Sequence, residues 1–173
     1  MKKGSDIKSI CLAGVMAAMV FVFTFTFKVP VGSMGYAHLG DAFIIVSVWI
    51  LGGKRAWIPA ALGAGLADLA TGYVIWILPT AIVKMLFALT IFLIAEKIFK
   101  CKTIGYVLGV IAAAAVHIVG YSLAWYIIGG AAGLTGAIIP LVIQTAIGAA
   151  LGTIMLIMLN SAGAGKKLKS MVR

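Results

Sequence analysis

Charged side chains are scarce in this sequence of 173 residues: they make up 10% of the chain, and only four of them are acidic. Soluble proteins contain about 25% charged and about 45–50% apolar residues, whereas 64% of this chain is hydrophobic. A soluble domain of this length still exposes about a third of its unfolded surface, so it cannot hide so much apolar surface. The scarcity of charge excludes a soluble enzyme or a nucleic-acid-binding protein and indicates a protein surrounded by lipid.

Sequence motifs that carry out chemistry are also absent. The chain contains no H-E-x-x-H, C-x-x-C or G-x-S-x-G motif. The tail at 163–167, Gly-Ala-Gly-Lys-Lys, lacks the first glycine, the Ser or Thr after the lysine and the preceding strand of a phosphate-binding loop. We therefore predict no catalytic residue, no cofactor, no metal site and no nucleotide hydrolysis, so any energy source must be a separate chain.

Long apolar runs predict an all-α polytopic membrane protein, with residues 1–173 forming a single domain. About 20 apolar residues cross the hydrocarbon layer, and the runs predict six transmembrane helices, at 9–28, 41–52, 56–73, 79–99, 104–129 and 137–160. The first run lacks a small-x-small cleavage site, which favours an uncleaved helix over a signal peptide. The Gly- and Pro-containing segment 29–40 is predicted to be a loop.

The positions of Lys and Arg predict the orientation of these helices, because basic residues are enriched in cytoplasmic loops. With the N-terminus inside, twelve of the fourteen basic residues are cytoplasmic, and only Lys28 and Lys84 lie on the outer side. Both termini are therefore predicted to be cytoplasmic. Cys11 and Cys101 then lie on the reducing side of the membrane, so no disulfide is expected.

Small residues four positions apart recur within the runs and allow helix backbones to approach closely in lipid. Examples are Ala13 and Ala17 in the first run and Gly148 and Gly152 in the last. The simplest interpretation is packing within the bundle. Ala13 and Ala17, in the inner half of the first helix, are also candidates for docking a partner helix.

Asp68 and Lys84 are ionisable residues within apolar runs, about five residues from the outer ends of their helices. At 1.5 Å per residue both lie roughly 7 Å deep, and the short connection between the helices predicts that they face each other. An ionisable residue inside a membrane is costly and marks a functional site by default. Two interpretations stay open: a buried ion pair that only fixes helix register, or residues lining a polar pocket open to the outside.

Further polar and aromatic residues occur at a similar depth. His117, Tyr121 and Trp125 are spaced by four and form one stripe along the fifth helix. Such a stripe suits a flat heteroaromatic ligand, although Trp125 alone is typical of a membrane interface. The remaining candidates lie in the sixth helix and around the first outer loop: Gln144, Tyr36, His38 and Asp41. They are expected to line or cap the pocket, or, for the loop residues, only to solvate the loop.

Several segments carry a family resemblance. The six helices, the pair Ala13 and Ala17 and the segments 35–41 (GYAHLGD), 51–54 (LGGK), 65–73 (GLADLATGY) and 79–84 (PTAIVK) resemble the substrate-binding S components of energy-coupling factor (ECF) vitamin transporters. The resemblance is to the branch associated with riboflavin, hydroxymethylpyrimidine or pyridoxine.

The resemblance implies a subunit of a bacterial plasma membrane that captures a vitamin at its outer face. It implies partners too: a transmembrane T component, which Ala13 and Ala17 would contact, and two cytoplasmic ATPase subunits that drive toppling and release inside. The segment 29–40 would be a lid. The set of one acid, one amine, a His and aromatics favours a small pyridine or pyrimidine vitamin, with riboflavin still open.

An alternative function is a stand-alone, ion-coupled secondary transporter of a small metabolite, with Asp68 as a proton or sodium site. The sequence shows no inverted repeat between the first three and last three helices, which weakens this alternative.

Overall fold

The computed structural model describes residues 3–31, 35–52 and 55–172. The elements, in chain order, are α1 (Lys3–Thr26), β1 (Lys28–Val31), β2 (Gly35–His38), α2 (Gly40–Leu51), α3 (Trp57–Ala70), a 3₁₀ turn (Val74–Trp76), α4 (Ile77–Phe92), a π-helical segment (Leu93–Ile98), α5 (Thr103–Ser161) and α6 (Ala164–Val172). The predicted helices agree with these bounds to within a few residues at most ends.

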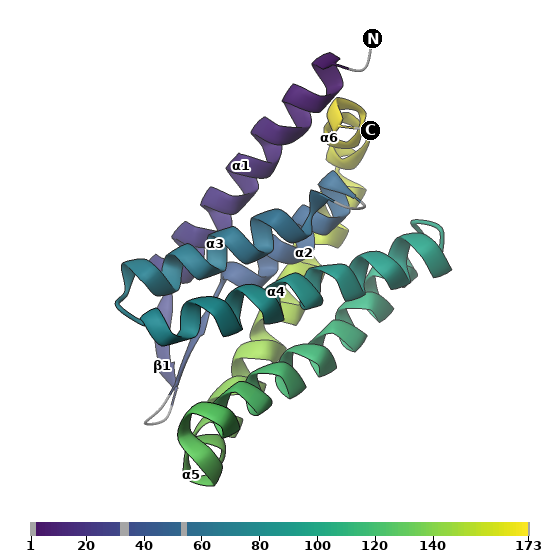
Figure 1. The fold of residues 1–173 in the computed structure, drawn as a ribbon. Helices are drawn as coiled ribbons and strands as arrows, with labels where there is room; N and C mark the ends of the chain where they lie inside the picture. The colour runs from purple at the N-terminus through teal and green to yellow at the C-terminus, as the bar shows by residue number, and fades with distance from the viewer. Residues whose placement is uncertain (1–2, 32–34, 53–54, 173) are drawn as a thin grey trace.

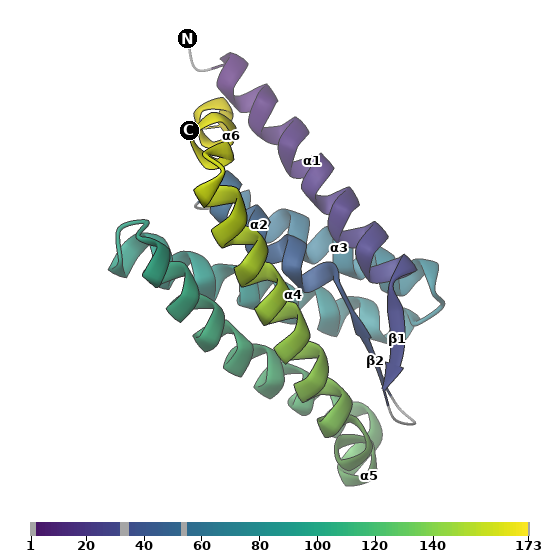
Figure 2. The ribbon, with the colours of Figure 1, turned by 180° about the vertical axis from the view of Figure 1, so that it is seen from behind.

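Helix α5 consists of two helical arms joined by a break at Gly130. Gly130 has φ +63° and ψ −159°, a conformation that is essentially restricted to glycine because it lacks a Cβ. In Figures 1 and 2 the green first arm runs to one end of the molecule, and the yellow-green second arm returns. Residues 130–136 lie between the predicted helices 104–129 and 137–160; the structure confines the break to Gly130, and residues 131–136 are helical.

The predicted loop at 29–40 contains a short β-hairpin, and every other regular element of the described chain is helical, in agreement with the all-α prediction. Strands β1 and β2 pair antiparallel, with Lys28 opposite His38 and Val31 opposite Gly35. Val29 and Val31 favour extended backbone because their branched side chains restrict χ1. The hairpin brings His38, its last residue, to the start of α2.

Three segments of the described chain are long and apolar enough to cross a membrane: Ile7–Thr26, Val74–Ile98 and Thr103–Ser161. Helices α2 and α3 are shorter apolar helices. Since the third segment contains both arms of α5, it is long enough for more than one pass. The count of six spans and the cytoplasmic termini stay predictions.

Helix α2 forms the centre of the bundle and contacts α1, α3, α4 and α5 (Figure 2). Every residue of α2 is buried except Phe43, which is partly buried. A helix that is apolar on all sides is expected to be covered by protein or lipid. Here protein covers α2, which explains how a helix of only 12 residues fits into a membrane protein.

Close packing of α1 on α3 depends on Gly63. A Cβ at this position would lie 2.6 Å from the carbonyl oxygen of Ala17 and 2.7 Å from the Cβ of Val20. Ala17 therefore lies where α1 packs on α3, and Ala13 packs against the hydrophobic core. Both alanines are partly buried, so they take part in packing within the bundle.

Helix α6 closes the end of the bundle where α1 begins, and the two ends of the chain lie near each other there (Figure 1). The Lys169 ammonium lies 4.3 Å from the centre of the Trp49 ring and 5.6 Å from that of Tyr106. Leu168 packs against the core. These contacts attach α6 to the last turn of α2 and the first turn of α5.

Candidate functional site

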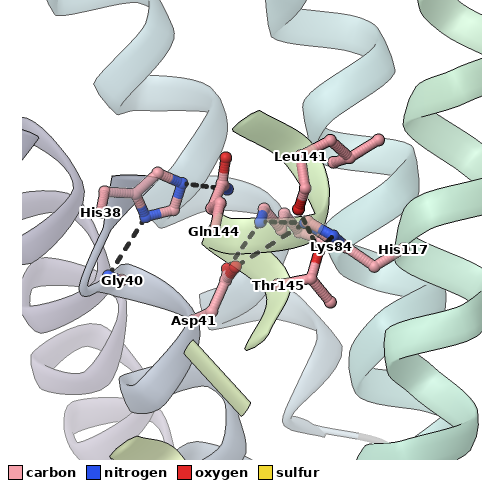
Figure 3. A network of polar contacts seen from close by, with 8 residues as sticks. All are labelled: His38, Gly40, Asp41, Lys84, His117, Leu141, Gln144 and Thr145. Atoms are coloured by element: carbon pink, nitrogen blue, oxygen red, sulfur yellow. Dashed lines mark hydrogen bonds and ion pairs between the residues drawn. The ribbon is translucent and has the colours of Figure 1, made fainter. Parts of the chain in front are cut away.

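A buried network of polar side chains links α2, α4 and both arms of α5 (Figure 3). At its centre the Lys84 ammonium donates to Asp41 Oδ1 over 2.6 Å and lies 2.7 Å from His117 Nε2. Lys84 and His117 are fully buried, and the side chain of Asp41 is 2% exposed. Taking charges out of water at this depth is costly unless they are paired and hydrogen-bonded, and here they are.

Asp41 occupies the first turn of α2, where the partial positive charge of the helix N-terminus favours a carboxylate. The second arm of α5 approaches it closely at Gly148, where a Cβ would lie 2.7 Å from the Cβ of Asp41. A side chain at 148 would displace Asp41. The glycine therefore fixes the position of the carboxylate relative to α5.

The direction of the hydrogen bonds through His117 follows from their last acceptor. The Thr145 hydroxyl donates to the Leu141 carbonyl over 2.7 Å, so its oxygen accepts from His117 Nδ1, also at 2.7 Å. His117 Nδ1 then carries the proton, and Nε2 of the neutral ring accepts from Lys84. The hydrogen bonds therefore run in one direction, from the Lys84 ammonium through the His117 ring and the Thr145 hydroxyl to the Leu141 carbonyl.

A second contact joins the hairpin to α5. The backbone N–H of Gly40 donates to His38 Nδ1 over 3.2 Å, so Nδ1 of His38 carries no proton and its Nε2 donates. The Gln144 side-chain amide lies 2.9 Å from His38 Nε2. The amide nitrogen of Gln144 faces His38 in the structure, and rotation of the amide by half a turn would bring its oxygen there as the acceptor that a protonated Nε2 requires.

An aromatic cluster continues from His117 along α5. The rings of His117 and Tyr121 meet edge to face with centroids 4.8 Å apart, and Lys84 Nζ lies 5.3 Å from the centre of the Tyr121 ring. Trp76 lies between Tyr121 and Trp125, with centroid distances of 6.3 Å and 4.5 Å. Tyr121, Trp125 and Trp76 are only partly buried, so a ligand can meet these rings next to the polar network.

The structure brings most of the predicted site residues together: His38, Asp41, Lys84, His117, Tyr121, Trp125 and Gln144. Lys84 was predicted to face Asp68, and this prediction was wrong. The carboxylate beside the Lys84 ammonium is that of Asp41. Asp68 is buried on α3. Its backbone carbonyl accepts hydrogen bonds from the Tyr73 N–H and the Thr71 hydroxyl. The side chain of Tyr36 lies outside the described part of the chain.

Sequence reasoning missed Thr145 and Trp76. Thr145 lies 28 residues from His117, and a helical threonine next to Gln144 gives no signal of its own. Trp76 falls in the connection between α3 and α4, which was predicted only as a link. Across the part of the chain that the structure describes, no group of three His, Cys, Asp or Glu side chains is arranged to hold a metal ion.

The chain is similar to a known protein family and to a solved structure along most of its length. The family described as "ECF-type riboflavin transporter, S component" matches residues 4–161. The chain belongs to this family. A solved structure, described as that of the S component of a bacterial ECF transporter, is similar over 92% of this chain and 96% of the other, with a TM-score of 0.72 and 20% identity. No curated protein sequence matches the chain.

Membership confirms the resemblance seen in the sequence. This S component is an integral membrane subunit of a transporter, and its family is one of substrate-binding proteins and not of enzymes. At 20% identity, the similarity to the solved structure concerns the fold.

Proposed function

We propose that this S component binds a flat heteroaromatic vitamin between the network of Asp41, Lys84 and His117 and the rings of Tyr121, Trp76 and Trp125. The observation that carries the proposal is the edge-to-face contact of His117 with Tyr121, which joins the polar groups to the aromatic cluster. Aromatic rings bind a flat ring by stacking, and buried polar groups orient it by hydrogen bonds.

Riboflavin is the vitamin named in the description of the family, and pyridoxine and hydroxymethylpyrimidine are smaller candidates that the same residues suit. All three share a flat heteroaromatic ring with a hydrogen-bonding edge. With the predicted orientation, the aromatic cluster lies on the outer side, where an S component that takes up a vitamin must meet it.

Mass spectrometry of the purified protein tests this function most directly. The full chain, extracted in detergent and denatured, is expected to release one of these vitamins, and titration of the emptied protein is expected to show tight binding. Absence of any bound organic molecule, together with no binding of the three vitamins, would contradict the proposal.

We also propose that delivery requires a T component and two ATPase subunits, with Ala13 and Ala17 of α1 at the docking surface. Both are partly buried, and Gly14 and Ala18 beside them are exposed, so this part of α1 presents small residues. Small residues allow a partner helix to approach closely in lipid.

Replacing Ala13 with Leu is expected to abolish vitamin uptake in cells while the purified variant still binds the vitamin. Val22→Leu is the matched control, because Val22 is exposed on the same helix and lies at its other end. Loss of binding in the Ala13 variant, or equal loss of uptake in the control, would assign Ala13 to bundle packing alone.

A further inference from the structure

We infer that the turn between α4 and α5 binds the headgroups of anionic phospholipids. This basic turn, residues 97–104, contains Lys97, Lys100 and Lys102 and no acidic residue. It connects the π-helical segment (Leu93–Ile98) to the first arm of α5 and projects from the bundle in both views (Figures 1 and 2). The inference does not depend on which vitamin the protein binds.

The basic turn lies where two membrane-capable segments meet. Val74–Ile98 ends in the turn and Thr103–Ser161 begins in it, so residues 99–102 separate the two segments. At 1.5 Å per residue along a helix, the three lysines lie within a few ångströms of the segment ends. Phospholipid headgroups occupy the zone just outside the hydrocarbon core, so the lysines lie at the depth of the headgroups.

The three lysines are available to an anion. All three are exposed, and none forms an ion pair with a carboxylate in the part of the chain that the structure describes. Lys97 Nζ lies 6.0 Å from the centre of the Phe92 ring, as expected for a lysine whose stem lies along apolar surface while its ammonium reaches polar surroundings. The neighbouring acid, Glu96, accepts a hydrogen bond from the Tyr106 hydroxyl.

Exposed apolar side chains accompany the lysines. Ile98 is 66% exposed and Ile104 is 52% exposed, and each lies within two residues of a lysine in the sequence. An acidic protein surface would offer carboxylates to the lysines but no apolar partner to the two isoleucines. An anionic phospholipid offers a charged phosphate and acyl chains side by side, and surfaces that combine basic and apolar residues bind such lipids. The composition of the turn therefore favours a lipid as its partner.

The backbone of the turn holds Lys100 in an unfavourable conformation. Lys100 and Cys101 have φ +49° and +64°, in the left-handed region that is unfavourable for residues with a Cβ. The Cys101 N–H donates to the Ala95 carbonyl over 2.8 Å, and the Lys102 N–H donates to the Phe99 carbonyl over 3.1 Å. Glycine would adopt this backbone without strain. Since strained residues concentrate at functional positions, we assign the Lys100 side chain a role beyond closing the turn.

Native mass spectrometry of the full-length protein in detergent measures lipid binding. Phosphatidylglycerol is the anionic probe, and phosphatidylcholine with the same acyl chains is the zwitterionic one. Each lysine near an anionic headgroup strengthens binding about fivefold, so the wild-type protein is expected to bind phosphatidylglycerol at least about tenfold more tightly. The preference is expected to decrease as the salt concentration rises.

Two results with the wild-type protein would overturn the inference. One is equal binding of the two lipids, whatever the lysines contribute to assembly with other proteins. The other is displacement of phosphatidylglycerol by an equal concentration of glycerol 3-phosphate, because the turn would then bind a soluble phosphate and not a lipid.

Variants test whether the basic turn causes the preference. Replacing Lys97, Lys100 and Lys102 together with Gln is expected to lower the preference at least about tenfold. Replacing the same three with Arg is the matched control, which keeps the charges and should keep the preference. Lys100→Gly suits the left-handed backbone, so it is expected to fold and to lower the preference about fivefold. An unchanged preference in the folded Gln variant, or in Lys100→Gly if the Gln variant does not fold, would overturn the inference.

Discussion

Lys84 and Asp41, 43 residues apart in the sequence, form a buried ion pair with Nζ and Oδ1 2.6 Å apart. The pair connects α4 to the first turn of α2, the helix at the centre of the bundle. Because both groups are shielded from water, the pair fixes how these two helices are placed and where the charges of the candidate site lie.

Breaking the pair from one side is expected to destabilise the protein. Lys84→Met alone leaves the Asp41 carboxylate buried without its cation and should cost about 3–5 kcal/mol. The double variant Lys84→Met with Asp41→Leu removes both charges and should lose much less. Thermal unfolding in detergent measures the difference. A double variant as unstable as the sum of the two single ones would show that the residues act independently.

Thr145 is expected to affect ligand binding through His117. Thr145→Val keeps the shape of the side chain but removes the acceptor for His117 Nδ1–H, which costs about 1–3 kcal/mol for a buried group. His117 can then change tautomer and present a proton to Lys84, so vitamin affinity should fall. Thr145→Ser keeps the hydroxyl and should restore affinity; if both variants bind alike, the hydroxyl has no such role.

Tryptophan fluorescence is expected to report ligand binding through Trp76 and Trp125, whose ring centroids are 4.5 Å apart. Loss of one stacked ring costs about 0.5–1.5 kcal/mol beyond its buried area, so Trp125→Ala should weaken vitamin binding about tenfold. Trp57→Phe, at the exposed start of α3, is the control and should preserve affinity and quenching. Equal quenching in both variants would place the ligand elsewhere.

Gly148→Ala is expected to impair the site, because the added Cβ would lie 2.7 Å from the Cβ of Asp41. Asp41 must shift, and its bond to Lys84 must lengthen, so both thermal stability and vitamin affinity should decrease. Gly14→Ala is the matched control: no atom lies within 4 Å of its added Cβ, and alanine favours helix by about 1 kcal/mol over glycine. Comparable losses in the two variants would contradict the structural explanation.

Lys169→Ala is expected to loosen α6 without changing the binding site. The Lys169 ammonium lies 4.3 Å from the Trp49 ring centre, and such a contact contributes about 0.5–2 kcal/mol. Faster amide exchange in α6 with an unchanged vitamin affinity is the expected result. Lys102→Ala, exposed before α5, should show neither effect. A large loss of affinity in the Lys169 variant would mean that α6 is coupled to the site.

The sequence predicted where the ionisable residues lie but not which of them meet. Asp68 and Lys84 were expected to pair because they lie at similar depths on helices joined by a short connection. The depth of a residue depends on its distance along the helix. Its pairing depends on how each helix is rotated about its own axis, because that rotation determines the neighbour toward which the side chain points. In the structure Lys84 pairs with Asp41. Asp41 lies further from Lys84 in the sequence than Asp68 does, and it belongs to α2 instead of α3.

Composition, the length of the apolar runs and the segments around 35–41 and 79–84 were enough to indicate a helical membrane protein, its family and most of the side chains at its candidate site. These properties are local, since they depend on the solvent that a segment prefers and on the order of its residues. The tertiary structure alone decided that α2 is enclosed by protein, that a hairpin precedes it, and that Thr145 orients His117. Those features arise from contacts between distant segments, where close packing at glycines such as Gly148 fixes which side chains face each other.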